Sequence, residues 1–445
     1  MRSVFLGVVI VYLLALGFSN PFVAAIAYLW IDIVKPQSLA YSAVITSLPL
    51  SLISGVVVIV AYAMSKKGDS FRFSPVQWLI MTFAVWITFT TYIADPMLEP
   101  WVKWDPSFKA LVFTVLIPLL FRSRLQLEAL FITLIFSLAT IVFSAGVKTL
   151  MGGGGYGTLA VLGGANSGMA ESSTLSAVAL MMLPLIHFVY QRSIILPNSR
   201  MFKLLLLAVG VTAIAAVVGS TARTGLVAGA FLLFFYLLRS QYKFVWAIIL
   251  TIMIGIGSTL ELEGSSWGQR MTTINSYDED ASATGRIDVW KWTLKFVAQH
   301  PLGGGFDAYR FNGIATPGGQ TNASLSRPTV VGGKAFHSIY FEVLGEQGFF
   351  GFFLYFSVML LTFFKLNKIR RFTKNKPELE WANDLAAKMF DAQAVLMVAG
   401  LFIGIAYQPV MFYLVAATIC LSNVVLKKTA PTWNVRNDAK KYSAA

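Results

Sequence analysis

Apolar residues along this chain occur in long runs separated by short polar stretches. Runs of about 17–25 residues predict helices that cross a lipid bilayer, because about 20 apolar residues span its hydrocarbon core. The pattern therefore predicts an all-α, polytopic membrane protein. We expect membrane-spanning helices at 41–64, 76–94, 108–121, 126–148, 170–190, 201–219, 222–238, 242–258, 336–364, 388–408 and 409–426.

The first apolar segment, residues 3–33, is too long for one ordinary span and short for two. The sequence Ser-Asn-Pro at 19–21 is a candidate break within it. Arg2 and the run that follows lead directly into further apolar segments. We therefore expect an uncleaved anchor rather than a signal peptide that is removed.

Lysine and arginine lie mostly in the loops on one side of this predicted array. If residues 3–33 cross once overall, the positive-inside rule places both termini in the cytoplasm and predicts about 12 spans. The alternative is about 13 spans with the N-terminus outside. The cytoplasmic clusters are Lys66/Lys67/Arg72, Arg122/Arg124, Arg192/Arg200/Lys203, Arg239/Lys243, Lys365/Lys368/Arg370/Arg371/Lys374/Lys376 and Lys427/Lys428, whereas the short opposite loops hold only Lys35, Lys103, Lys109, Lys148 and Arg223.

Residues 259–335 form an unusually long polar loop on the outer side, with seven acidic and seven basic side chains. Because connections between membrane helices are usually short, we expect this loop to be a functional cap. A second outer stretch, the glycine-rich 151–172, is expected to be a flexible or re-entrant lip. We divide the chain into N-terminal transmembrane helices (1–258), the outer loop (259–335), C-terminal transmembrane helices (336–426) and a cytoplasmic tail (427–445).

Composition agrees with this assignment and excludes several classes of function. The 445 residues are 56% hydrophobic and 13% charged, with a mean hydropathy of +0.68. The net charge of +14 does not indicate nucleic-acid binding, because the positive charge lies mostly in short loops between apolar runs. The single cysteine, Cys420, excludes a disulfide framework. With three histidines in the whole chain, we expect no metal centre and no cofactor.

Three candidate cations gather at the outer face. His337 stands at the outer entrance of the run 336–364, and Arg223 lies in the outer turn "GSTARTG". Arg286 opens an amphipathic segment, for which we expect a helix capped by Ser282 or Thr284. An arginine in the first turn of a helix opposes the helix dipole, so its placement there favours a bound anion such as a phosphate.

Each of these residues also has a purely structural interpretation. Arg223 alone fits an arginine that snorkels to the interface, and Arg286 alone fits a solvated side chain. His337 is either a structural interfacial histidine or a general base acting on a hydroxyl, for which a pKa near neutrality is suited. Glu342 and Glu346 are four residues apart on one helix face, and we expect Glu346 to make internal hydrogen bonds rather than to catalyse.

Equally informative is the set of motifs that the chain lacks. It has no P-loop, no dinucleotide fingerprint and no soluble α/β domain for a nucleotide-sugar donor. An anionic substrate held by arginines at the outer face would have to carry its own leaving group. A polyprenyl-diphosphate-linked sugar meets that requirement.

Three segments carry a resemblance to a known family. "HSIYFEVLGEQGFFG" resembles the H-[SN]-x-Y-x-x-x-L-x-E-x-G-x-x-G signature of the O-antigen ligase and polymerase superfamily. "STARTG" resembles that family's [ST]-x-S-R-x-G turn, with Ala222 where serine is usual. "GRIDVWKWTLKFVAQHPLGGGFDAY" resembles its R-x-x-x-W…P-x-x-G-x-G stretch. The N-terminal half is similar to the branch described as an O-glycosylation ligase associated with exosortase systems.

The resemblance implies an inverting, metal-independent glycosyltransferase in the bacterial inner membrane. Such an enzyme moves a glycan from undecaprenyl diphosphate to an acceptor on the periplasmic side, where residues 259–335 would then be the periplasmic loop. Carried over by position, His337 is the base, and Arg223 and Arg286 bind the diphosphate. The candidate supporting residues are Lys334, Tyr340, Glu346 and Arg310.

Three acceptors and one different class of function remain open. The leading hypothesis is an O-antigen ligase that uses the lipid A–core sugar. A polymerase that extends the glycan and a protein O-oligosaccharyltransferase that uses Ser or Thr share the same chemistry. A transporter of lipid-linked glycan is the non-enzyme alternative, although the charged residues cluster at one face rather than at the membrane midplane.

Overall fold

The computed structural model describes residues 2–65, 73–153, 169, 171–239, 244, 248, 281–314 and 333–426. Within these ranges every regular element is a helix, which confirms the predicted all-α class for this part of the chain. Six of the described helices are long and apolar enough to cross a membrane. They are α5 (Pro75–Ile93), α7 (Arg124–Leu150), α8 (Ser172–Arg192), α9 (Arg200–Gly219), α14 (Ile339–Thr373) and α16 (Pro409–Leu426).

The remaining helices complete the bundle. Four shorter apolar helices are α1 (Arg2–Ser19), α2 (Pro21–Val34), α4 (Leu50–Met64) and α10 (Arg223–Arg239). The others are α3 (Ala43–Thr46), α6 (Pro100–Leu120), α13 (Ala281–Gln299) and α15 (Glu380–Ala399). The total of about 12 spans stays a prediction.

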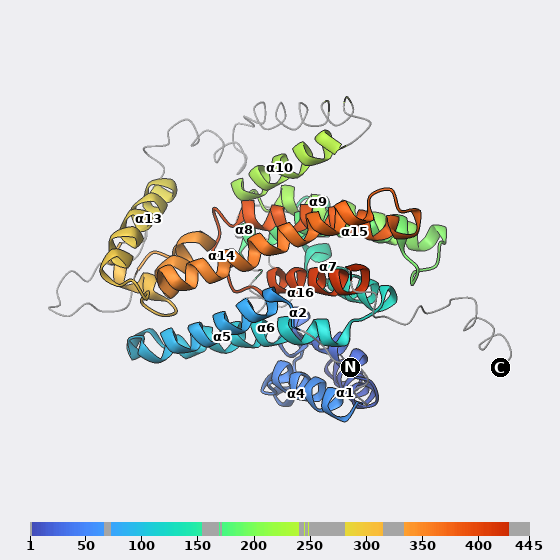
Figure 1. The fold of residues 1–445 in the computed structure, drawn as a ribbon, viewed down its shortest axis with the longest axis horizontal. Helices are drawn as coiled ribbons and strands as arrows, with labels where there is room; N and C mark the ends of the chain where they lie inside the picture. Colours follow the sequence, from blue (N-terminus) through green and yellow to red (C-terminus); the bar gives the residue numbers. More distant parts are fainter. Residues whose placement is uncertain are drawn as a thin grey trace.

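Helix α14 lies at the centre of this arrangement. It packs against α5, α15 and α16, and α13 packs against it as well. In Figure 1 α13 stands steeply across the end of the bundle where α14 begins. The N-terminal helices reach the same core, because α16 packs against α6 and the Tyr413 hydroxyl of α16 donates a hydrogen bond to Asp32 of α2.

Polar residues and proline set where several helices begin. Asn20 caps α2, with Pro21 at its first position, so the predicted break at 19–21 is confirmed and residues 3–33 form two helices. Ser74 and Gln77 form a capping box at α5, in which the Ser74 amide donates to Gln77 Oε1 at 3.0 Å. Each of these caps satisfies amide groups that have no partner inside the helix.

Several predicted boundaries are wrong, and two helices begin eight residues earlier than predicted, α6 at Pro100 and α15 at Glu380. The run 41–64 is not one helix, since Pro49 precedes α4 and only the short α3 lies before it. Helix α14 starts at Ile339 rather than at 336, and continues past the apolar run to Thr373. Helix α15 ends at Ala399 instead of 408, and the backbone beyond it bonds to the start of α14: Gly400 O accepts from Ile339 N at 2.8 Å.

The helix predicted from Arg286 exists as α13, but it begins at Ala281. Arg286 therefore lies in its second turn, and Ser282 and Thr284 lie inside it rather than before it. The expected placement of Arg286 in the first turn, next to the helix N-terminus, is therefore wrong, whereas its role toward an anion stays a prediction.

Some predicted segments lie outside the described residues. These are most of the span 242–258, the loop stretches 259–280 and 315–332, most of the glycine-rich lip, and the tail from 427 to 445.

Candidate active site

His337 lies two residues before α14, in an unusual backbone conformation. Its φ is 46°, in the left-handed region that side chains other than glycine rarely adopt. The flanking backbone is fixed on both sides: Trp290 Nε1 of α13 donates to Phe336 O at 3.0 Å, and Ile339 N donates to Gly400 O at 2.8 Å. A strained residue held in this way by its surroundings is typical of functional sites.

Two cations lie beside His337. Burial is the largest cause that lowers the His337 pKa from 6.5 to about 4, and the charges of Arg286 and Lys334 lower it further. A Cβ atom added at Gly285 would lie 1.9 Å from Lys334 Nζ, so the lysine lies directly on the α13 backbone next to Arg286. The structure therefore brings His337, Arg286 and Lys334 together, from the outer loop and the start of α14.

Asn312 fixes the backbone of Lys334. The Lys334 amide donates to Asn312 Oδ1 at 3.1 Å, and Asn312 Nδ2 donates to Lys334 O at 2.7 Å. Asn312 ends the short 3₁₀ helix η5 (Ala308–Asn312). The segment that leads to His337 is thus attached to the loop that precedes the undescribed residues 315–332.

Glu171, just before α8, belongs to the same region and was not singled out from the sequence. Burial raises the pKa of its carboxyl, a hydrogen bond from Thr174 lowers it, and the charge of Arg286 lowers it too. The glycine-rich setting of Glu171 gave no signal that it would lie within electrostatic reach of Arg286. Its carboxyl lies outside the membrane-spanning helix, at the same end of the bundle as His337.

Arg223 begins α10 directly after a strained turn. Thr221 has a φ of 49°, and Ser220 Oγ lies 2.6 Å from Ser176 Oγ on α8. A Cβ atom added at Gly225 would lie 3.0 Å from Ser176 Cβ, so the turn lies close against α8. The structure therefore places the Arg223 turn against α8, and a position of Arg223 beside His337 stays a prediction.

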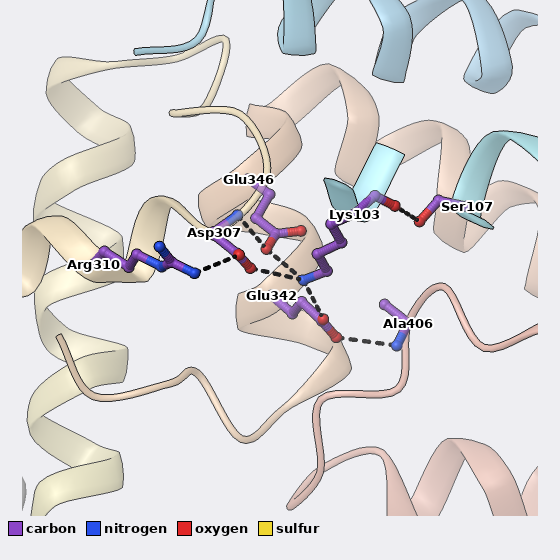
Figure 2. A network of polar contacts seen from close by, with 7 residues as sticks. All are labelled: Lys103, Ser107, Asp307, Arg310, Glu342, Glu346 and Ala406. Atoms are coloured by element: carbon purple, nitrogen blue, oxygen red, sulfur yellow. Dashed lines mark hydrogen bonds and ion pairs between the residues drawn. The ribbon is translucent and has the colours of Figure 1, made fainter. Parts of the chain in front are cut away.

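A second polar cluster lies further into α14, and we call it the Lys103 cluster (Figure 2). Lys103 Nζ of α6 lies 2.6 Å from Glu346 Oε1, 2.8 Å from Glu342 Oε1 and 3.8 Å from Asp307 Oδ1. Arg310 pairs with Asp307 at 3.3 Å. Glu346 is fully buried, and its Oε1 also accepts from the Asp307 amide at 3.0 Å. The expectation that Glu346 makes internal hydrogen bonds is confirmed.

The loop 301–309 is attached to α14 where that helix is broken. Gly348 has a φ of 65° inside α14, and Phe349 N donates to Pro301 O at 3.1 Å. Gly304 N and Gly305 N donate to the carbonyls of Gly345 and Glu346 at 3.0 and 2.9 Å. These bonds explain the glycines of "PLGGG" and "EQG", since a Cβ at Gly303 would lie 2.5 Å from Glu346 O.

The predicted supporting residues therefore separate into different places. Lys334 lies beside His337, whereas Glu346 and Arg310 belong to the Lys103 cluster. Tyr340 faces α15, where its hydroxyl donates to Met397 O at 3.2 Å, and its ring stacks on Phe356 at 4.9 Å.

A cavity of about 520 Å³ lies next to the Lys103 cluster. Its lining includes Lys103 and Glu342, together with Asp105, Tyr407 and Met169. Met169 precedes Glu171 by two positions, but His337, Arg286 and Lys334 are not among the lining residues. Within the described ranges no group of three His, Cys, Asp or Glu side chains is placed to hold a metal ion.

Comparison with known families divides the chain into two parts. Residues 208–356 match the family described as O-antigen ligase. Residues 1–194 match a family of unknown function, DUF5935. No curated protein matches the chain. The O-antigen ligase segment contains His337, Arg286 and Arg223, whereas the segment of unknown function contains Lys103 and Glu171.

Proposed function

We propose a specific reaction for this chain, which belongs to the O-antigen ligase superfamily through residues 208–356. Membership implies an integral membrane protein with glycosyltransferase activity of the ligase or polymerase type. The enzyme transfers a glycan from undecaprenyl diphosphate to an acceptor hydroxyl on the periplasmic side of the bacterial inner membrane. It needs no metal or cofactor. The observation that carries this proposal is the strained His337 beside Arg286 and Lys334 at the entrance of α14.

His337 acts as the general base. Its neutral imidazole takes the proton from the acceptor hydroxyl as that oxygen attacks the anomeric carbon of the glycan. The bond between this carbon and the diphosphate oxygen breaks, and undecaprenyl diphosphate leaves with the electron pair. Arg286, Arg223 and Lys334 stabilise the negative charge that develops on the leaving group. A single displacement of this kind inverts the configuration of the anomeric carbon.

The acceptor that we propose is the lipid A–core sugar, which makes the protein an O-antigen ligase. The match of residues 208–356 to the O-antigen ligase family supports this choice of acceptor. A growing glycan or a protein Ser or Thr would undergo the same chemistry. Surface lipopolysaccharide of a deletion strain separates the three, since it shows core without O-chains, core plus one unit, or normal chains, respectively.

For the topology we propose about 12 spans, with residues 259–335 in the periplasm and both termini in the cytoplasm. The one-sided distribution of lysine and arginine supports this orientation. Reporter fusions at Arg200 and Arg370 are expected to indicate the cytoplasm, and a fusion at Ser276 the periplasm. A cytoplasmic result at Ser276 would overturn both the orientation and the proposed location of the site.

The test of function uses the purified full-length chain, undecaprenyl-diphosphate-linked glycan and a lipid A–core acceptor. Wild type is expected to form product, whereas His337→Ala loses roughly 10²- to 10⁴-fold in rate and still binds donor. His300→Ala is the matched control, because His300 is an exposed histidine of the same loop that stacks on Phe296. Equal activity of His337→Ala and wild type would remove His337 from the mechanism.

A further inference from the structure

The Lys103 cluster joins the two matched parts of the chain. Lys103 lies on α6, within the segment that matches the family of unknown function, whereas Glu342, Glu346 and Asp307 lie in the O-antigen ligase segment. The same interface contains two further bonds to one residue: Trp86 Nε1 donates to Gln347 O at 2.9 Å, and Thr90 Oγ1 donates to Gln347 Oε1 at 2.6 Å. The N-terminal part thus makes polar contacts with the break in α14.

We propose that Lys103 is a positioning residue, which holds the loop 301–309 and the first turns of α14 together and thereby fixes His337. This proposal rests on the proposed role of His337 as the base. It assigns a function to the N-terminal part of the chain, because that part supplies the cation that holds the site in the C-terminal part in place.

The first link runs from Lys103 to the loop. Its ammonium lies 2.6 Å from Glu346 Oε1, and the same oxygen accepts from the Asp307 amide at 3.0 Å. Asp307 itself has a φ of 61°, so this amide is held in an uncommon backbone conformation. Without Lys103, the buried Glu346 carboxylate would lose its nearest cation in a place that excludes water.

The second link runs from Lys103 to His337. Glu342 Oε1 accepts from Lys103 at 2.8 Å, and Glu342 Oε2 accepts from Ala406 N at 3.0 Å. The Glu342 amide donates to Ser338 O at 2.8 Å, next to His337. Lys103 therefore fixes one side of the first turn of α14, and the segment after α15 fixes another. A displacement of about 1 Å at a reacting group can cost roughly 100-fold in rate.

A direct role of Lys103 on the diphosphate is the competing interpretation. The ammonium already donates to two carboxylates and lies 5.2 Å from the centre of the Tyr407 ring. Its side chain is 26% exposed, which leaves part of it accessible to a substrate. The two roles differ in what a charge-neutralising second substitution does.

The experiment compares Lys103→Met, Lys103→Arg and the double variant Lys103→Met/Glu346→Gln in the full-length protein. The double variant removes the cation together with one buried negative charge, while the amide oxygen at position 346 can still accept from the Asp307 amide. Lys109→Met is the matched control, since Lys109 lies on the same helix, lines the same cavity, is 27% exposed and pairs with Asp105 at 2.6 Å.

Two measurements are made on each variant. The first is steady-state transfer, for which Lys103→Met is expected to lose about 10- to 100-fold in kcat, with the donor KM within about threefold of wild type. The second is hydrogen–deuterium exchange of residues 301–309 and 338–349, which is expected to quicken in Lys103→Met and to stay unchanged in Lys109→Met. Lys103→Arg and the double variant are expected to recover part of both.

The results separate the possibilities. If the double variant restores slow exchange but stays as inactive as Lys103→Met, or if only the donor KM rises, Lys103 acts on the substrate and the proposal is overturned. Unchanged exchange and activity in Lys103→Met would overturn it as well. If wild type transfers no glycan, the proposed function fails, and the exchange measurement still decides whether Lys103 holds the loop and α14 together.

Discussion

The two polar clusters at the start of α14 are built in opposite ways. Around His337, the cations Arg286 and Lys334 lie beside a histidine on a strained backbone, whose pKa is lowered by burial first and by these cations further. In the Lys103 cluster, opposite charges meet at 2.6 and 2.8 Å. Cations beside a neutral histidine are stabilised when an anion arrives, whereas a cation already paired with carboxylates gains little. From this difference we expect the first cluster to bind and transform substrate and the second to hold the structure.

The largest expected effect tests the cationic side of this comparison. Arg286→Ala is expected to lower transfer by roughly 10²- to 10³-fold and to weaken donor binding, because we propose that the guanidinium contacts the diphosphate before and during the reaction. Arg223→Ala is expected to act in the same direction. Arg286→Lys is expected to recover only part, since lysine lacks the planar fork.

Lys291→Ala is the control, because Lys291 is an exposed cation on the same helix, α13. Donor binding and transfer measured separately decide the outcome. Intact donor binding in Arg286→Ala would contradict its assignment to the diphosphate.

The next effect is on the free energy of unfolding, and we expect it to be larger for a change in the Lys103 cluster than for a change in the His337 cluster. Lys103→Met is expected to lower the free energy of unfolding by about 3 kcal/mol, because it leaves buried carboxylates uncompensated. This value is at the low end for such pairs, since Lys103 is 26% exposed. Arg286→Ala is expected to change it by less than about 1 kcal/mol. Thermal unfolding in detergent measures both variants, and the reverse order would refute the comparison.

A smaller effect tests the strain at His337. His337→Gly is expected to be more stable than His337→Ala by about 1 kcal/mol, because only glycine adopts a φ of 46° without cost. Both variants are expected to be equally inactive. The same unfolding measurement compares them, and equal stabilities would show that the backbone at this position is not strained.

The smallest expected effect is that of chelation. If arginine and lysine side chains handle the diphosphate, transfer is expected to continue unchanged in EDTA. Loss of activity that Mg²⁺ or Mn²⁺ restores would assign the diphosphate to acidic residues bound to a metal instead.

Hydrophobic patterning predicted most helices but not their ends. The apolar run ends at 364, yet α14 continues to Thr373, because a helix carrying lysine and arginine remains regular in water. The run to 408 suggested a continuous helix, but residues after Ala399 bond to the first turns of α14 instead. Neither outcome can be read from local hydropathy, since each depends on what surrounds the segment.

Motifs brought out the His337 cluster, but from the Lys103 cluster they brought out Glu342, Glu346 and Arg310 without Lys103, the partner of the two glutamates. His337 and Arg286 lie in segments with a recognisable spacing of residue types. Lys103 is 239 residues from Glu342, and its own segment resembles nothing that suggests a partner. The cost of leaving a charge without a partner near membrane depth was the one available signal, and it applies to Lys103 as well as to Glu342 and Glu346.

The pH dependence of transfer tests the central claim most directly, namely that His337 is a neutral base, kept so by burial and by neighbouring cations. A base works when deprotonated, so activity is lost as pH falls through its pKa. For the free enzyme the acidic limb of kcat/KM is expected well below pH 6.5, toward the value of about 4. In Arg286→Gln this limb is expected to move upward, because one of the cations that lowers the His337 pKa is gone. An acidic limb at the same pH in wild type and Arg286→Gln would contradict the account.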